Sequence, residues 1–147
     1  VEQQQAGLLS PVHLSTGHLN EDDREDLLLS GQTVSNQPAV AVLINNGSGR
    51  FPIDALPLSL TPAGSFAAVA DMDGDGKSDV VSYGAASSTL AVWRGQGDGK
   101  SFAMSFQQVQ SGLSALVVRD MDADQHPDLL LLSADRRSLT LLYQSCP

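Results

Sequence analysis

The sequence predicts an all-β fold made of three repeated units of about 50 residues each. Three observations predict it. Val, Leu and Ala are abundant whereas aromatic residues make up only 5%. The chain carries 13 Gly and 7 Pro, which suits short strands joined by tight turns. One acidic pattern also recurs three times along the 147 residues, and such self-similarity indicates one supersecondary unit per copy.

The repeat is marked by a nine-residue acidic loop. The first loop (18–26) reads HLNEDDRED, the second loop (71–79) reads DMDGDGKSD, and the third loop (120–128) reads DMDADQHPD. Most of the 17 Asp and Glu residues of the chain fall in these loops. The acidity is therefore concentrated, as a metal site requires.

Short apolar stretches surround each loop and predict four strands per unit. Residues 66–70 and 115–118 lead into the second and third loops, and each loop runs directly into another apolar stretch. Third strands are expected at 39–44, 89–93 and 138–143. Glycine-rich turns at 45–51 and 95–102 then lead to fourth strands near 51–60 and 102–109. Hairpins joined by such turns are expected to form antiparallel sheets.

The strands are expected to be buried on both faces. Runs such as 40–44 and 129–132 are apolar without alternation and too short for helices. Blades stacked face to face in a β-propeller have such strands, because each inner sheet has a neighbour on both sides. We therefore predict propeller blades at 10–60, 61–110 and 111–147, the last without its fourth strand, with a spare outer strand at 1–9.

The second loop has the spacing of a calcium site. Carboxylates stand at its positions 1, 3, 5 and 9, and Gly76 permits a bend that turns the carbonyl of Lys77 inward. Calcium takes about six to eight oxygen ligands in irregular geometry, which such a loop can supply. An EF-hand is the alternative, but position 12 is Ser82 where a Glu is needed, and the sequence after the loop favours a strand over a helix.

The outer loops depart from this pattern. The third loop keeps all four carboxylates but has Gln125 in place of the glycine, and Pro127 stiffens the approach to the last ligand. The first loop begins with His18, and imidazole is a poor ligand for calcium. Its alternative interpretation is a solvated turn in which Arg24 satisfies a neighbouring carboxylate.

The pattern at 66–81, followed by the turn at 95–102, resembles the FG-GAP/VCBS repeat. Such repeats form propeller blades in integrin α-subunit heads and in many secreted or surface bacterial proteins, with calcium bound between the first and second strands. The resemblance covers nearly the whole chain. The ligands that it implies are Asp71, Asp73, Asp75, Lys77 and Asp79, then Asp120, Asp122, Asp124, His126 and Asp128, and in the first copy Asn20, Asp22, Arg24 and Asp26.

The charge and composition of the chain limit the kinds of partner that it can bind. A formal net charge of -9 disfavours nucleic acid and anionic membrane surfaces as partners, and no apolar run approaches the roughly 18 residues of a membrane span. Cys146 is the only cysteine, so an internal disulfide is excluded and the redox compartment stays open. The start at Val1 suggests a processed or excised chain.

The expected function is a calcium-stabilised scaffold or binding module, extracellular, on the cell surface or periplasmic, that recognises a glycan or a protein through its loops. Alternatives are a structural subunit of a larger surface assembly or an accessory domain of a polysaccharide-acting enzyme. Catalysis by the chain itself is not expected, because His13, His18 and His126 are scattered. Trp93 and Tyr83 could stack on a sugar, although their apolar stretches are more typical of a core.

The ends of the chain predict a dimer. Residues 1–8 resemble 106–113, so the N-terminal segment can supply the strand that the third unit lacks. Two chains that exchange these strands would close a ring of six blades. A fragment of a longer propeller is the alternative.

Overall fold

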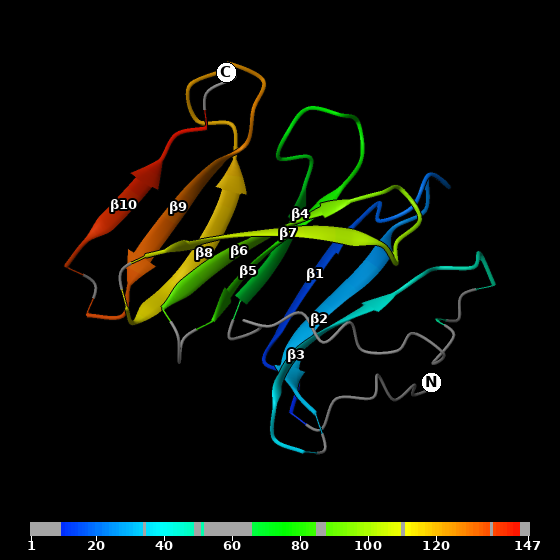
Figure 1. Ribbon diagram of the computed structural model, residues 1–147, viewed down its shortest axis with the longest axis horizontal. Helices are drawn as coiled ribbons and strands as arrows, with labels where there is room; N and C mark the ends of the chain where they lie inside the picture. The colour runs from blue at the N-terminus through cyan, green and yellow to red at the C-terminus, as the bar shows by residue number, and fades with distance from the viewer. Residues whose placement is uncertain are drawn as a thin grey trace.

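The computed structural model describes residues 10–33, 35–48, 51, 66–84, 88–109, 111–135 and 137–144. These residues form three antiparallel sheets and no helix (Figure 1). Blade 1 contains β1 (His13–Gly17), β2 (Asp26–Gln32) and β3 (Pro38–Leu43). Blade 2 contains β4 (Phe66–Ala70), β5 (Asp79–Gly84), β6 (Thr89–Gly95) and β7 (Phe102–Gln108). Blade 3 contains β8 (Leu113–Arg119), β9 (Asp128–Ser133) and β10 (Leu139–Leu142). The all-β prediction is confirmed.

Blade 2 shows the complete unit, in which four strands pair in the order β4-β5-β6-β7. Blades 1 and 3 show the first three strands of the same arrangement, in the orders β1-β2-β3 and β8-β9-β10. The predicted fourth strand of the first unit, at about 51–60, lies outside the described residues except for Phe51. The predicted spare strand at 1–9 and Cys146 also lie outside them.

The blades stand side by side in chain order and share two apolar cores (Figure 1). The core between blades 1 and 2 includes Leu28, Val40, Val80 and Trp93. The core between blades 2 and 3 includes Met72, Tyr83, Leu90 and Leu131. All six residues of β5 are buried, because this strand has a neighbouring blade on each side. Strands buried on both faces therefore occur as the apolar runs predicted.

The two aromatic residues considered for sugar stacking belong to these cores. Tyr83 is fully buried, and the indole N–H of Trp93 donates a hydrogen bond of 3.1 Å to the Ser82 hydroxyl inside the protein. Neither ring is available at the surface.

The pairing register of the strands identifies equivalent residues in the three blades. In each blade the second strand begins at the ninth residue of the acidic loop, which is Asp26, Asp79 or Asp128. The residue four positions later pairs with the third strand. These pairs are Ser30 with Val40, Tyr83 with Leu90, and Leu132 with Leu139.

Candidate metal centre

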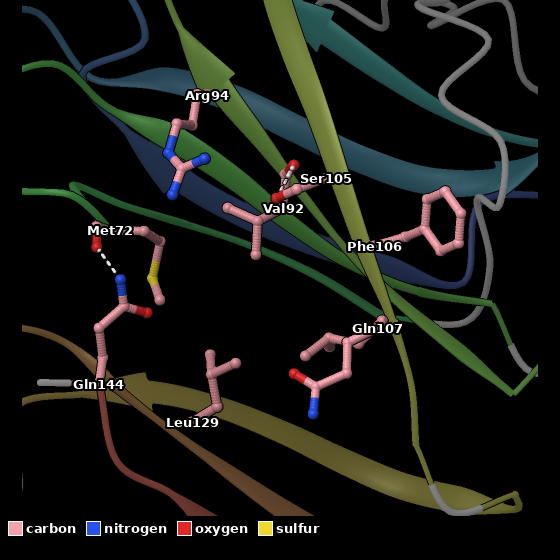
Figure 2. Close-up of a pocket in the computed structure, with 9 residues that line it drawn as sticks. Met72, Val92, Arg94, Ser105, Phe106, Gln107, Leu129 and Gln144 are labelled. Atoms are coloured by element: carbon pink, nitrogen blue, oxygen red, sulfur yellow. Dashed lines mark hydrogen bonds between the residues drawn. The ribbon is translucent and has the colours of Figure 1, made fainter. Parts of the chain in front are cut away.

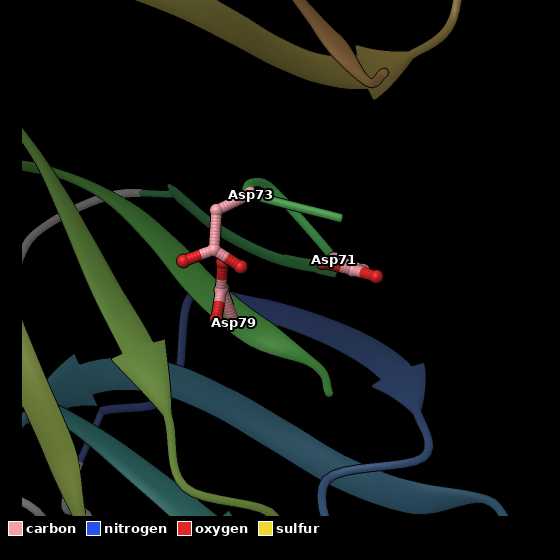
Figure 3. Close-up of side chains that lie close together, drawn as sticks. All are labelled: Asp71, Asp73 and Asp79. Atoms are coloured by element: carbon pink, nitrogen blue, oxygen red, sulfur yellow. The ribbon is translucent and has the colours of Figure 1, made fainter. Parts of the chain in front are cut away.

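The second loop joins β4 to β5 and gathers three carboxylates (Figure 3). Asp71, Asp73 and Asp79 each offer an oxygen within 4.8 Å of the others. The loop shape is held by Asp71, whose two oxygens accept hydrogen bonds of 2.8 Å from the amides of Gly74 and Gly76. Both glycines have a left-handed backbone, at φ 74° and 83°, a conformation that is costly for residues with a side chain. Each carboxylate oxygen keeps a further lone pair, so these bonds leave room for a cation.

Asp79 is the buried member of the group. Its Oδ2 accepts a hydrogen bond of 2.9 Å from the Met72 amide, and its Oδ1 accepts one of 2.8 Å from the Gly95 amide. Burial raises the pKa of Asp79; the two amides oppose this rise, and the nearby charges of Asp73 and Asp71 add to it. A divalent cation would relieve the crowding of negative charge, so the donor set fits calcium.

Asp73 faces a cation from the protein itself. The Arg94 Nε lies 2.8 Å from Asp73 Oδ2, so the guanidinium neutralises one edge of the group. Sequence reasoning missed Arg94. The antiparallel pairing of β5 with β6 was the signal that could have found it. Val80 pairs with Trp93, so Arg94, the next residue along β6, lies opposite Asp79.

Two other predicted ligands of the second loop have local contacts instead. Asp75 Oδ1 accepts a hydrogen bond of 2.8 Å from the Lys77 amide, and Asp75 Oδ2 lies 3.9 Å from the Lys77 ammonium. Asp75 is not in the group formed by the other three carboxylates. The assignment of Asp75 and of the Lys77 carbonyl as ligands stays a prediction.

The third loop, between β8 and β9, repeats the fold of the second. Asp120 accepts hydrogen bonds of 2.7 and 3.0 Å from the amides of Ala123 and Gln125, which adopt left-handed φ values of 65° and 72°. Gln125 therefore does not change the path of the backbone. Asp120, Asp122 and Asp124 bring their oxygens within 4.8 Å of one another. These three side chains also fit a cation.

Electrostatics in the third loop resemble those of the second. Desolvation raises the pKa of Asp122, and repulsion from Asp124, Asp128 and Asp120 adds to the rise although the Asp124 amide opposes it. The predicted ligand Asp128 is buried and outside the group of three, where it accepts hydrogen bonds from the amides of Met121 and Gln144. The His126 amide donates to Asp124 at 2.8 Å.

The first loop fits calcium less well than the other two. The Arg24 guanidinium contacts the Asp22 carboxylate and donates through Nε to the carbonyl of Asn45 at 2.9 Å. Desolvation raises the pKa of Asp22, but hydrogen bonds from Arg24 and Asn20 and the charge of Arg24 outweigh it and leave the pKa below its usual value. The Arg24 side chain thus already neutralises the Asp22 carboxylate. This contact is the one expected if the first loop is a solvated turn. His18, at the first ligand position, has its Nε2 3.7 Å from Glu25 Oε1.

One atom of the first loop still has the character of a ligand. Asn20 Nδ2 donates to Asp22 at 3.0 Å, whereas Asn20 Oδ1 is buried without a hydrogen-bond partner. Asp26 accepts from the amides of Leu19 and Asn45 at 2.9 and 2.8 Å, as the equivalent aspartates do in the other loops.

The profile of the FG-GAP-like repeat family matches residues 18–82 and 71–131. The chain belongs to this family. FG-GAP-like repeats are typical of β-propeller-like binding modules in extracellular or secreted proteins. The two matches overlap on the second loop, so each spans two of the three acidic loops. No curated protein matches the chain.

A groove adjoins the second loop of this FG-GAP chain, between blades 2 and 3 (Figure 2). Its volume is about 220 Å³. Its polar side chains are Arg94, Gln107 and Gln144, whereas the ring of Phe106 points away from it on the other side of β7. Gln144 Nε2 donates a hydrogen bond of 2.6 Å to the carbonyl of Met72, inside the second loop. The described ranges contain no helix of the length and apolarity needed to cross a membrane.

Proposed function

We propose that this chain is a calcium-stabilised extracellular binding module that acts without catalysis. The observation that carries the proposal is the convergence of Asp71, Asp73 and Asp79 within 4.8 Å. Oxygen sites of this kind are usable where calcium is millimolar, as it is outside cells. The family, which is typical of extracellular or secreted proteins, supports the same location.

In this proposal calcium supplies positive charge that holds the loop between the first and second strands of a blade. Asp73 and Asp79 come from different ends of the second loop, so one ion that contacts both restrains the whole loop. Asp71 keeps the loop closed through its bonds to the Gly74 and Gly76 amides. Asp120, Asp122 and Asp124 would hold a second ion in the same way.

The partner is proposed to be a glycan or a protein segment that contacts the groove between blades 2 and 3. Val92 and Leu129 offer apolar surface, while Arg94, Gln107 and Gln144 offer hydrogen-bond donors (Figure 2). Binding sites commonly combine an apolar surface with a few converging polar groups. Arg94 and Gln144 also contact the second loop, so an ordered loop would favour an ordered groove.

The non-catalytic role is supported by what the histidines contact. His13 packs edge-on against Phe66, with the ring centroids 5.9 Å apart. His18 lies near Glu25, and His126 follows Asp124 in the third loop. The clustered carboxylates have the spacing of a cation site, which accounts for them without acid–base chemistry.

Thermal unfolding with and without calcium tests the proposal, because an ion that binds only the folded state raises its Tm. Asp73→Asn is the most direct variant, since Asp73 contacts Arg94 at the surface whereas Asp71 and Asp79 also hold the backbone. Chelator should lower the Tm of the wild type and have a much smaller effect on Asp73→Asn. Glu25→Gln removes an exposed charge outside the second and third loops and should behave like the wild type. A wild-type melting curve that is identical in calcium and chelator would contradict the metal proposal.

The partner is tested separately with a glycan array and with pull-down from the surface fraction of cells. Signal that is lost in chelator and in Gln107→Ala supports recognition through the groove, which the Gln107 side chain enters (Figure 2). Binding that survives Gln107→Ala would place the partner elsewhere. Silence on the array, together with capture of a surface protein, would favour the role of structural subunit.

A further inference from the structure

The seventh residue of the acidic loop differs between the blades, and in the first loop it is Arg24. Its equivalents are Lys77 and His126, because in each loop the amide of the seventh residue donates to the carboxylate of the fifth, at 3.1, 2.8 and 2.8 Å. The Lys77 ammonium stays 3.9 Å from that carboxylate. In the first loop Arg24 Nη2 contacts Asp22 Oδ2, and Arg24 Nε donates to the carbonyl of Asn45 at 2.9 Å.

The contacts of Arg24 connect the three residues that a calcium ion in the first loop would bridge. Asn20 Nδ2 donates to Asp22 at 3.0 Å. Asn45, whose carbonyl accepts from Arg24, donates its own amide to Asp26 Oδ1 at 2.8 Å. Asn20, Asp22 and Asp26 are thus linked through Arg24 and Asn45. A guanidinium is permanently charged and carries five N–H donors, so it supplies both positive charge and directed bonds to the loop.

The backbone of the first loop also departs from that of the other two. In the second and third loops an aspartate at the first position accepts two amides, and the fourth and sixth residues are left-handed. His18 has no carboxylate to accept the equivalent bonds. Of the described residues of the first loop, only Asp23, the sixth, has a left-handed φ, at 56°. The first loop therefore lacks the shape that the other two share.

The turn after β6 of blade 2 rests on the first loop. Asp98 in this turn forms a β-bridge with Asn20. A Cβ added to Gly97 would come 2.7 Å from Glu21 Oε1, so the two backbones approach closely where glycine permits it. The first loop thus holds blade 1 to blade 2.

We propose that the guanidinium of Arg24 takes the place of calcium in the first loop and makes the contact between blades 1 and 2 independent of the ion. Calcium then acts only on the second and third loops, which rests on the calcium binding proposed for them above. The substitution is specific to Arg24, because neither Lys77 nor His126 links the candidate ligands of its own loop in this way.

The second and third loops meet at the contact between blades 2 and 3. The His126 ring lies against Gly74, where an added Cβ would come 3.3 Å from its Cε1. Gln144 of blade 3 reaches the carbonyl of Met72 in the second loop. The groove of the proposed binding function adjoins this contact. Removal of calcium should therefore loosen the groove while blades 1 and 2 stay joined.

Hydrogen exchange of the full chain, followed by mass spectrometry of its peptides in calcium and in chelator, tests the proposal. In the wild type, calcium should slow exchange at 71–79 and 120–128 and leave 18–26 unchanged. In Arg24→Ala, exchange at 18–26 in chelator should be about two- to fivefold faster than in the wild type, the range expected for a partly exposed ion pair. Arg137→Ala is the matched control, because it removes the same charge from an exposed side chain in the turn after β9. Its three loops should exchange as in the wild type.

A gain of binding gives a second readout that does not depend on loss of stability. The double variant His18→Asp with Arg24→Ser supplies the missing first carboxylate and removes the competing guanidinium, and Asn20 Oδ1 is already without a hydrogen-bond partner. Native mass spectrometry should show one more calcium ion in this variant than in the wild type. His18→Asp alone should bind no additional ion, because Arg24 still holds Asp22.

Three results would overturn the proposal. They are calcium-dependent protection of 18–26 in the wild type, exchange of Arg24→Ala at the wild-type rate in chelator, and an additional ion in His18→Asp alone. Calcium that slows exchange in no loop would contradict the proposed calcium function instead. In that case the rate at 18–26 in Arg24→Ala still decides whether the guanidinium holds the first loop.

Discussion

The Gly95 amide donates a hydrogen bond of 2.8 Å to Asp79 Oδ1, and this bond joins the end of β6 to the start of β5. The same relationship links Asn45 to Asp26 at 2.8 Å and Gln144 to Asp128 at 3.0 Å. In every blade the other oxygen of the aspartate accepts the amide of the second loop residue. The ninth aspartate therefore acts as a clamp that holds the loop to two strands.

Asp79→Ala should destabilise the protein even in chelator. The substitution leaves the amides of Met72 and Gly95 without their acceptors, and each unsatisfied buried group costs about 1–3 kcal/mol. We expect the free energy of unfolding to fall by roughly 3 kcal/mol. Asp73→Ala removes an ion pair at the surface and should cost less than about 1 kcal/mol in chelator. Urea unfolding of both variants without calcium makes the comparison, and equal losses would contradict the clamp.

The left-handed positions of the second and third loops give a reciprocal pair of predictions. Gly76 and Gln125 are equivalent and have φ values of 83° and 72°. A left-handed conformation costs a residue with a side chain about 1–2 kcal/mol, so Gln125→Gly should raise the free energy of unfolding by about 1 kcal/mol. Gly76→Ala should lower it by a similar amount, since an added Cβ at Gly76 meets nothing within 4 Å and only the backbone is affected. The same sign for both changes in urea unfolding would show that strain is not the cause.

Local patterns predicted most of the fold because the repeat places the same short signals in each blade. The acidic loops, the strands that follow them and the burial of β5 on both faces could all be predicted from residues close together in the chain. At the second loop Asp71, Asp73 and Asp79 converge, as their spacing predicted, and Asp75 accepts a hydrogen bond from the Lys77 amide; the role of Asp75 as a ligand stays a prediction.

The features that sequence reasoning missed depend on contacts between distant residues. Arg94 reaches Asp73 because the β5–β6 register brings it there. The clamp formed by Gly95 and Asp79 links residues 16 positions apart. Met121 and Leu139 are exposed because blade 3 has a neighbouring blade on only one side among the described residues. The sequence of the repeat itself does not predict this exposure.

We predict two calcium ions per chain, at the second and third loops. Arg24 already neutralises Asp22 in the first loop, where His18 replaces the first carboxylate. Native mass spectrometry in calcium should therefore show two ions for the wild type and for Asn20→Ala. Asp122→Ala should show one, because it breaks the group at the third loop. Three ions in the wild type, with one lost in Asn20→Ala, would show that the unpartnered Asn20 Oδ1 is a ligand after all.

Asp98 should make the turn after β6 sensitive to acid. Its carboxylate accepts hydrogen bonds from the Ser101 hydroxyl and from the amides of Ser101 and Lys100. These bonds lower the pKa of Asp98 to about 2, and the bond from the Ser101 hydroxyl has the largest effect. The folded state thus binds this proton less tightly than the unfolded state, so the stabilisation is complete at neutral pH and is lost as the pH falls from about 4 towards about 2.

Asp98→Ala removes that pH-dependent contribution and weakens the turn that forms the β-bridge to Asn20 in the first loop. In chelator the variant should melt below the wild type at pH 7, and the difference in Tm should shrink steadily at acid pH. Glu25→Gln is a suitable control, because it removes an exposed carboxylate away from this turn. A Tm difference between wild type and Asp98→Ala that stays constant from neutral to acid pH would mean that the turn is held by its backbone conformation and that the charge of Asp98 contributes nothing.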